Sequence, residues 1–280
     1  MDAPPILATE PPSPGHPPVA PWKTWVMLFL VGSYPLVVGL VGQWLESEHA
    51  GGTVLPSSVA GLLAACAENL GLFLVLFGLG AAVARPTRAE LFATGFPGWK
   101  DWLLGLGYSV GLRVGLAVLL AAGLMIAGTV LQLRGQSLNS LQGLRPEVEN
   151  LLDPGALRNP VYFVLSLTVV SFVVAGFREE LWRAVVFAGV LRLAPRFGTS
   201  VPGRLAMVGA AAVIFGLGHL TMGWSGVVLT GLLGLGLGGI LIFHRSLWLA
   251  VLAHGFFDAT SFALFRVIDA LGALQQLLHK

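Results

Sequence analysis

The sequence predicts an all-α integral membrane protein, a bundle of about seven to eight membrane helices. Three observations predict this class. First, only 11% of the 280 residues are charged, whereas a soluble domain carries about 25% charged residues. Second, 55% of the residues are hydrophobic and the mean hydropathy is +0.81. Third, several apolar runs approach the ~20 residues that a helix needs to cross a bilayer.

The charge and the cysteine content exclude other classes. The net charge of +2 is small and the basic residues lie in short loops, so we expect a lipid bilayer around the protein and no nucleic-acid partner. The single cysteine, Cys66, lies in an apolar run. One cysteine excludes an internal disulfide and a zinc site built from cysteines.

The chain divides into a tail and a membrane domain. Residues 1–21 are rich in proline and have no basic start, which predicts a disordered cytoplasmic tail and not a signal peptide. Residues 22–280 are expected to form one integral membrane domain, and the segment 132–159 is polar enough to lie outside the membrane. The predicted spans are 22–44, 58–84, 102–131, 161–193, 205–218, 224–243 and 247–265. Because 161–193 is long for one crossing, we expect a kink or a cavity within it.

Loop charges predict the orientation. The loops 85–100, 192–204 and 244–245 carry the basic residues, which places them in the cytoplasm together with the N-terminus. In the sixth span, Gly234 and Gly238 form a small-xxx-small step that favours close helix packing.

Two adjacent carboxylates, Glu179 and Glu180, interrupt the fourth apolar run and lie between Arg178 and Arg183. Ionisable residues inside a span are costly to bury and usually functional. Glu179 and Arg183 are four residues apart, so they share one helix face and are expected to pair. Glu180 points about 100° away from Glu179 on an ideal helix.

Two histidines lie in equally apolar surroundings. His254 has Asp258 one turn later on the same face, and such a carboxylate can orient the imidazole ring. His219 ends the fifth span, where it could be a capping residue or part of a site. Counted from the cytoplasmic helix ends, both histidines come out buried and can converge with Glu179. A carboxylate beside two imidazoles can activate a water, with or without a metal.

Three motifs in this order resemble the CPBP intramembrane protease family, which includes type II CAAX prenyl endopeptidases and bacterial bacteriocin-processing and self-immunity (Abi-like) proteins. The resemblance covers the motif core, residues 161–265. The matching segments are Arg178-Glu179-Glu180-Leu181-Trp182-Arg183, Phe215 to His219, and Ser246-Leu247-Trp248 followed by His254-Gly255-Phe256-Phe257-Asp258.

The resemblance implies a glutamate that activates water, assisted by both histidines and by the third-motif aspartate. Carried over, the catalytic roles fall to Glu179 or Glu180, His219, His254 and Asp258, while Arg183 holds the carboxylates or orients the substrate. His219, His254 and Glu179 would be the ligands if zinc or another divalent metal is used. A bacterial inner membrane is the expected location.

The first motif departs from the family pattern. That pattern has three residues between the glutamate pair and the arginine, and here only Leu181 and Trp182 separate Glu180 from Arg183. If Arg183 is the fixed point, Glu179 takes the second glutamate position and Arg178 replaces the first. We prefer this register because a helix cannot lose a residue without rotating everything after it.

The leading hypothesis is therefore an intramembrane endopeptidase acting on a peptide or protein presented at the membrane or from the cytoplasm. The alternative is a catalytically inactive membrane protein of the same fold that binds a peptide, as an immunity factor does. A proton-coupled transporter using Glu179, Arg113 and His254 is a third reading, which the lack of sequence repeats disfavours.

Overall fold

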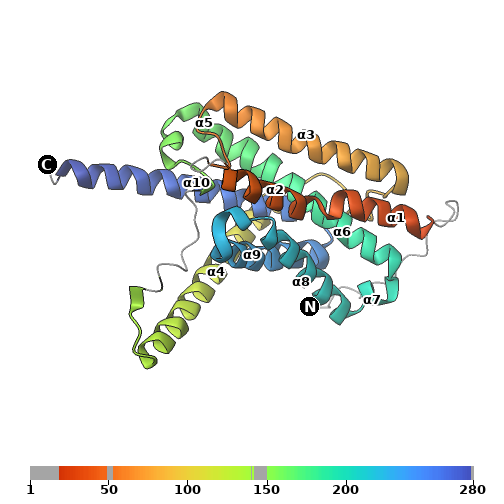
Figure 1. The fold of residues 1–280 in the computed structure, drawn as a ribbon. Helices are drawn as coiled ribbons and strands as arrows, with labels where there is room; N and C mark the ends of the chain where they lie inside the picture. The colour runs from red at the N-terminus through yellow and green to blue at the C-terminus, as the bar shows by residue number, and fades with distance from the viewer. Residues whose placement is uncertain (1–18, 49–52, 140, 142–149, 279–280) are drawn as a thin grey trace.

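The computed structural model describes residues 19–48, 53–139, 141 and 150–278, and these residues form a helical bundle (Figure 1). The predicted all-α class is confirmed. The predicted tail, residues 1–21, lies outside the described residues apart from residues 19–21.

Six helices of the described part are long and apolar enough to cross a membrane. They cover Pro21–Val41, Val59–Ala84, Trp99–Leu133, Pro160–Leu193, Leu220–His244 and Leu247–Gly272. The fifth predicted span corresponds to a shorter apolar helix, Val201–Leu217. The seventh was predicted to end near Phe265, but its helix continues to Leu278.

The first three spans contain α1 (Pro21–Met27), the π-helix η1 (Leu28–Gly32), α2 (Tyr34–Glu48), α3 (Val59–Ala84) and α4 (Trp99–Leu133). The short 3₁₀ helix η4 (Pro154–Arg158) then leads into the fourth run. The C-terminal part contains α7 (Pro195–Thr199), α8 (Val201–Leu217), η6 (Leu220–Met222), α9 (Gly223–His244) and α10 (Leu247–Leu278).

The fourth run is one long helical rod in three parts: α5 (Pro160–Leu165), the π-helix η5 (Ser166–Phe177) and α6 (Arg178–Leu193). Inside η5 the Ser171 hydroxyl donates to the Ser166 carbonyl five residues back, at 2.7 Å. A π-helix widens the backbone and re-phases every residue after it, and such segments are frequent at functional sites. A π-helical segment therefore lies directly before the glutamate pair, while the predicted kink or cavity stays a prediction.

Helix packing brings the three motif helices together. α8 packs along α9, while η5 and α4 both pack along α10. Gly234 and Gly238 lie at close contacts of α9, since a Cβ at Gly234 would meet Phe215 at 3.0 Å and one at Gly238 would meet Val208 at 3.2 Å. These contacts agree with the packing role predicted for the two glycines.

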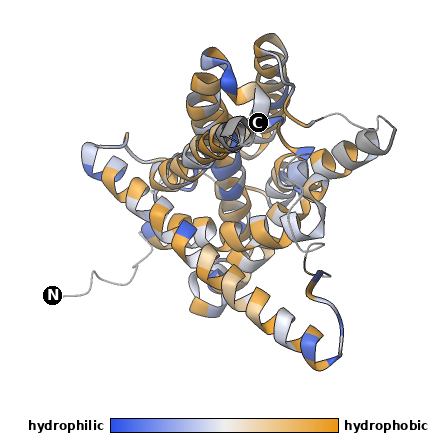
Figure 2. Cartoon of the chain, turned by 90° about the vertical axis from the view of Figure 1, so that its left-hand side faces the viewer, coloured by the Kyte–Doolittle hydropathy of each residue, from blue (hydrophilic) through white to orange (hydrophobic). Residues whose placement is uncertain are grey.

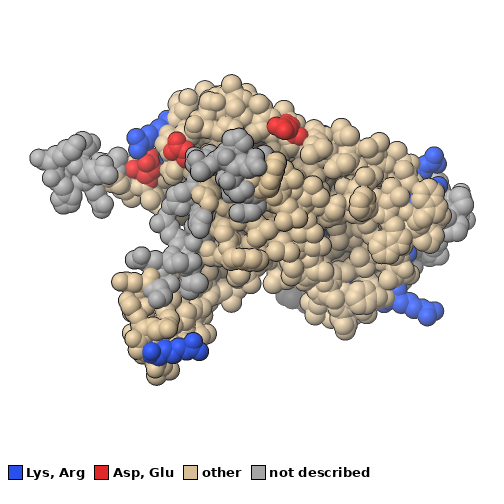
Figure 3. Space-filling view, viewed as in Figure 1, with Lys and Arg blue, Asp and Glu red and all other residues tan. Residues whose placement is uncertain are grey.

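The surface has the character expected in a bilayer. Hydrophobic residues run along the helices (Figure 2), and Lys and Arg lie toward the ends of the molecule with an almost uncharged surface between them (Figure 3). In the α4 span only 6% of the most apolar 18-residue stretch is buried inside the protein. In α6, by contrast, Trp182, Arg183 and Phe187 are completely buried. The helix that carries the glutamate motif is therefore central, and α4 lies at the periphery.

Candidate active site

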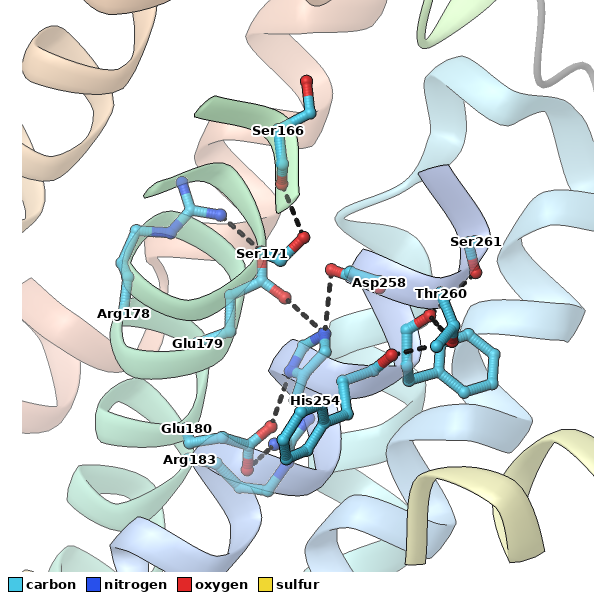
Figure 4. A network of polar contacts seen from close by, with 12 residues as sticks. Ser166, Ser171, Arg178, Glu179, Glu180, Arg183, His254, Asp258, Thr260 and Ser261 are labelled. Carbon is cyan, nitrogen blue, oxygen red and sulfur yellow. Dashed lines mark hydrogen bonds and ion pairs between the residues drawn. The ribbon is translucent and has the colours of Figure 1, made fainter. Parts of the chain in front are cut away.

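A cluster of ionisable side chains lies where α6 meets α10 (Figure 4). It has two halves. The buried half consists of Glu180, Arg183 and the Nδ1 side of His254. The open half consists of Glu179, Arg178, Asp258 and the Nε2 side of His254.

In the buried half, His254 Nδ1 lies 2.9 Å from Glu180 Oε1. A carboxylate only accepts, so Nδ1 donates this hydrogen bond. The other carboxylate oxygen, Glu180 Oε2, forms an ion pair with Arg183 Nη1, and the side chains of both residues are fully buried. Burying two charges is costly unless they are paired, so this pair holds α6 in one orientation.

This pairing corrects one expectation. Arg183 was expected to pair with Glu179, four residues away, but it pairs with Glu180, three residues away. Both spacings bring side chains together on a helix, and the sequence alone does not say which one faces α10. The structure decides it, because Glu180 also reaches His254 on that helix.

In the open half, two carboxylates face the other ring nitrogen of His254. Glu179 Oε2 and Asp258 Oδ2 each lie 3.7 Å from His254 Nε2. Side-chain exposure is 15% for Glu179 and 26% for Asp258, against none for Glu180. Glu179 and Asp258 are therefore the carboxylates that a water or a substrate can reach.

Arg178 fixes the second oxygen of Glu179. Its Nη2 donates to Glu179 Oε1, while its Nη1 donates to Asn69 Oδ1 at 3.2 Å and to the Tyr34 hydroxyl at 3.4 Å. The Tyr34 hydroxyl in turn donates to the Asn69 carbonyl at 3.1 Å. Sequence analysis missed Tyr34 and Asn69, although an asparagine within the apolar span 58–84 was a usable signal.

His219 lies at the edge of the cluster, at the end of α8. Its Nδ1 is 2.9 Å from the Phe215 carbonyl oxygen, which can only accept, so Nδ1 carries the proton and Nε2 is left as the acceptor of the neutral ring. The Phe215 ring separates the two imidazoles, with centroids 4.8 Å from His219 and 6.1 Å from His254. Among the described residues, His219 forms no hydrogen bond or ion pair with Glu179 or His254.

Arg113 reaches the cluster from the peripheral helix α4. Its Nη2 donates to the Phe257 carbonyl at 2.7 Å and to the hydroxyls of Thr260 and Ser261 at 2.6 and 3.1 Å. Its charge also acts on Asp258. Arg113 was named only in the transporter reading, and the structure uses it to tie α4 to α10.

Charge balance explains how the cluster is tolerated. Three arginines, Arg113, Arg178 and Arg183, accompany three carboxylates, Glu179, Glu180 and Asp258. Buried charges persist in apolar surroundings when they are paired and hydrogen-bonded.

A metal site needs several His, Cys, Asp or Glu side chains close together. Among the described residues, no group of three or more His, Cys, Asp or Glu side chains has the arrangement of a metal site. Zinc binds three or four such ligands at about 2.0–2.3 Å. The structure therefore does not show His219, His254 and Glu179 arranged as a ligand set, and a divalent metal at these residues stays a prediction.

Comparison with known proteins bears on the motif helices. The comparisons with curated proteins and with solved structures found no match. Residues 160–260 match the family model "Type II CAAX prenyl endopeptidase Rce1-like". This stretch includes η5, α6, α8, α9 and the start of α10, and therefore both halves of the cluster and His219, whereas Arg113, Tyr34 and Asn69 lie outside it. The resemblance predicted from the three motifs is thus confirmed as a similarity: residues 160–260 of this integral membrane protein are similar to the Rce1-like family of type II CAAX prenyl endopeptidases.

Proposed function

We propose that this protein is an intramembrane endopeptidase that hydrolyses a peptide bond of a membrane-associated or cytoplasmically presented peptide or protein. The open half of the cluster supports this most. There Glu179 Oε2 and Asp258 Oδ2 each lie 3.7 Å from His254 Nε2. This separation is too long for a direct hydrogen bond and suits a bridging water or substrate atom.

In this proposal Glu179 is the general base. Arg178 holds Glu179 Oε1, so Oε2 remains free to accept a proton from water. His219, whose Nδ1 is engaged by the Phe215 carbonyl, positions the same water by accepting a hydrogen bond at Nε2. As Glu179 takes the proton, the water oxygen attacks the scissile carbonyl carbon. Positioned bases of this kind contribute about 10²–10⁴-fold to the rate.

His254 stabilises the negative charge that develops on the substrate carbonyl oxygen. Its Nδ1 is engaged by Glu180, which fixes the ring and directs Nε2 toward the open half. A protonated Nε2 donates a hydrogen bond to the oxyanion. The proton held by Glu179 then passes to the leaving amine nitrogen, which frees the amine and restores the carboxylate. Asp258, 3.7 Å from the same Nε2, attracts the protonated ring through its negative charge.

A second function is favoured by one residue. In the register preferred above, Arg178 stands where the family pattern has its first glutamate, and it binds one oxygen of Glu179. A catalytically inactive protein that binds and sequesters a peptide, as an immunity factor does, would retain the cluster but not turn over substrate.

The test is cleavage by the full chain reconstituted in liposomes. The probes are prenylated CAAX peptides, their unprenylated counterparts and a mixed peptide library read by mass spectrometry. We expect the wild type to cleave at least one class and Glu179→Gln to lose about 100-fold or more of that activity. Glu68→Gln, which changes an exposed carboxylate of α3, is the matched control and should stay within twofold. Binding of a peptide without cleavage would favour the inactive reading.

A further inference from the structure

A pocket of about 280 Å³ lies at the other end of α6, away from the polar cluster. It is enclosed by the segment after α3 and by the ends of α6, α7, α8 and α9. Its charged lining residues are Arg192, Arg204, Arg245 and Glu90, and the rest of the lining is mostly apolar or small. Its volume is close to the small end of the range for ligand pockets, about 300–1,000 Å³.

The charge of this basic pocket is not balanced. Glu90 is engaged by Arg192, whose Nε and Nη2 donate to its two oxygens at 2.6 and 2.7 Å. Within the described part of the chain, Arg204 and Arg245 form no ion pair. Three positive charges and one negative charge leave the pocket with two unmatched positive charges beside apolar walls. Apolar walls strengthen the attraction of such charges for an anion.

Three residues with left-handed backbone lie in or beside the segments that line the pocket. Arg85, Phe92 and Arg245 are the non-glycine residues with positive φ in the described part, at 47°, 56° and 54°. Phe92 and Arg245 line the pocket, and the Arg85 carbonyl accepts from Arg192 Nη2 at 3.2 Å. Arg85 and Arg245 are the left-handed C-caps of α3 and α9, a common way for a helix to end, so these angles fix where Arg245 leaves α9 beside the pocket.

The pocket lies at a level where lipid headgroups are expected. Tryptophans mark membrane–water interfaces, and Trp22, Trp25 and Trp99 begin the helices at this end with 60%, 61% and 70% exposure. This is also the end that the loop charges place in the cytoplasm. Basic pockets between membrane helices on the cytoplasmic side suit anionic lipid headgroups. We propose that the basic pocket binds the phosphate of an anionic phospholipid headgroup, with Arg204 and Arg245 as its cationic ligands.

The experiment titrates the purified full chain with phosphatidylglycerol or phosphatidylcholine and counts the retained lipids by native mass spectrometry. We expect the wild type to retain one phosphatidylglycerol at a concentration at least tenfold lower than phosphatidylcholine. The double variant Arg204→Gln/Arg245→Gln should lose this preference. Arg88→Gln/Arg196→Gln removes the same charge from exposed positions at the same end that do not line the pocket, and should keep the preference within twofold.

Three results would overturn the proposal. One is equal retention of the two lipids by the wild type. The second is an equal loss of preference in the two double variants, which would assign the effect to diffuse surface charge. The third is release of the bound phosphatidylglycerol by millimolar inorganic phosphate, which would identify free phosphate and not a lipid as the occupant. Retention that survives inorganic phosphate and requires Arg204 and Arg245 supports a lipid site.

Discussion

Glu179 and Glu180 are neighbours in the chain, but their side chains lie in different halves of the polar cluster. Glu180 is fully buried and is bound on both oxygens, by His254 and by Arg183. Glu179 is bound on one oxygen by Arg178, its other oxygen lies 3.7 Å from His254 Nε2, and its side chain is 15% exposed. The buried half is therefore built to be rigid, and the open half keeps an unengaged oxygen that chemistry can use.

The difference assigns separate roles to the two halves. In the buried half a change should appear first as lost stability, because it leaves a buried charge without its partner. In the open half a change should appear first as lost activity, with little effect on folding. Stability and activity measured on the same variants can therefore confirm or break the distinction.

The largest stability effect is expected for Glu180→Ala. This change leaves Arg183 buried and unpaired, and breaking a buried ion pair in this way costs about 3–5 kcal/mol. The measurement is the free energy of unfolding in detergent micelles. Glu68→Ala, at an exposed carboxylate of α3, is the control and should cost no more than about 0.5 kcal/mol.

A double variant checks the reason for that loss. Replacing the pair by apolar residues, Glu180→Leu/Arg183→Met, should recover most of the stability lost in Glu180→Ala. Its activity should stay low, since His254 then lacks the partner of Nδ1. If the double variant is as unstable as the single one, the ion pair is not what stabilises the buried half.

A smaller effect is expected for Arg178, which belongs to the open half. Arg178→Gln should lower kcat about tenfold, because Glu179 loses the cation that orients its carboxylate. Stability should fall by less than in Glu180→Ala, since the side chains of Arg178 and Glu179 are 13% and 15% exposed whereas Glu180 and Arg183 are fully buried. Arg178→Lys restores the charge and should recover part of the rate. Unchanged kcat in Arg178→Gln would show that Glu179 needs no positioning.

Much of the helical bundle and part of the polar cluster could be predicted from the sequence. The other contacts could not, for physical reasons. Hydropathy was enough for the helices because long apolar runs have few other solutions in a membrane. The proximity of His254 and Asp258 could be predicted because they are four residues apart on one helix. The partner of Arg183 could not be predicted, because the π-helix η5 changes which face of α6 points toward α10.

The contacts that two distant segments make with the polar cluster could not be predicted from the sequence either. Arg113 and Asn69 reach the cluster from α4 and α3, and neither helix carries a motif that would connect it to Glu179. Side chains within one helix follow its period, whereas contacts between helices depend on packing that a single sequence does not reveal.

The smallest effect is expected outside the cluster, at the ion pair between Glu90 and Arg192. Burial alone would raise the pKa of Glu90, but hydrogen bonds from Arg192 and Thr87 outweigh it and hold this pKa below its usual 4.5. A lowered pKa stabilises the fold at pH values above 4.5, and this contribution is lost as the pH falls through the lower pKa of the folded state. Glu90→Gln should therefore cost about 1 kcal/mol at pH 7, a typical upper value for a half-exposed pair. The gap in unfolding free energy between wild type and variant should close as the pH is lowered below 4.5. A gap that stays constant between pH 7 and pH 3 would show that Glu90 stabilises this end by packing and not by its charge.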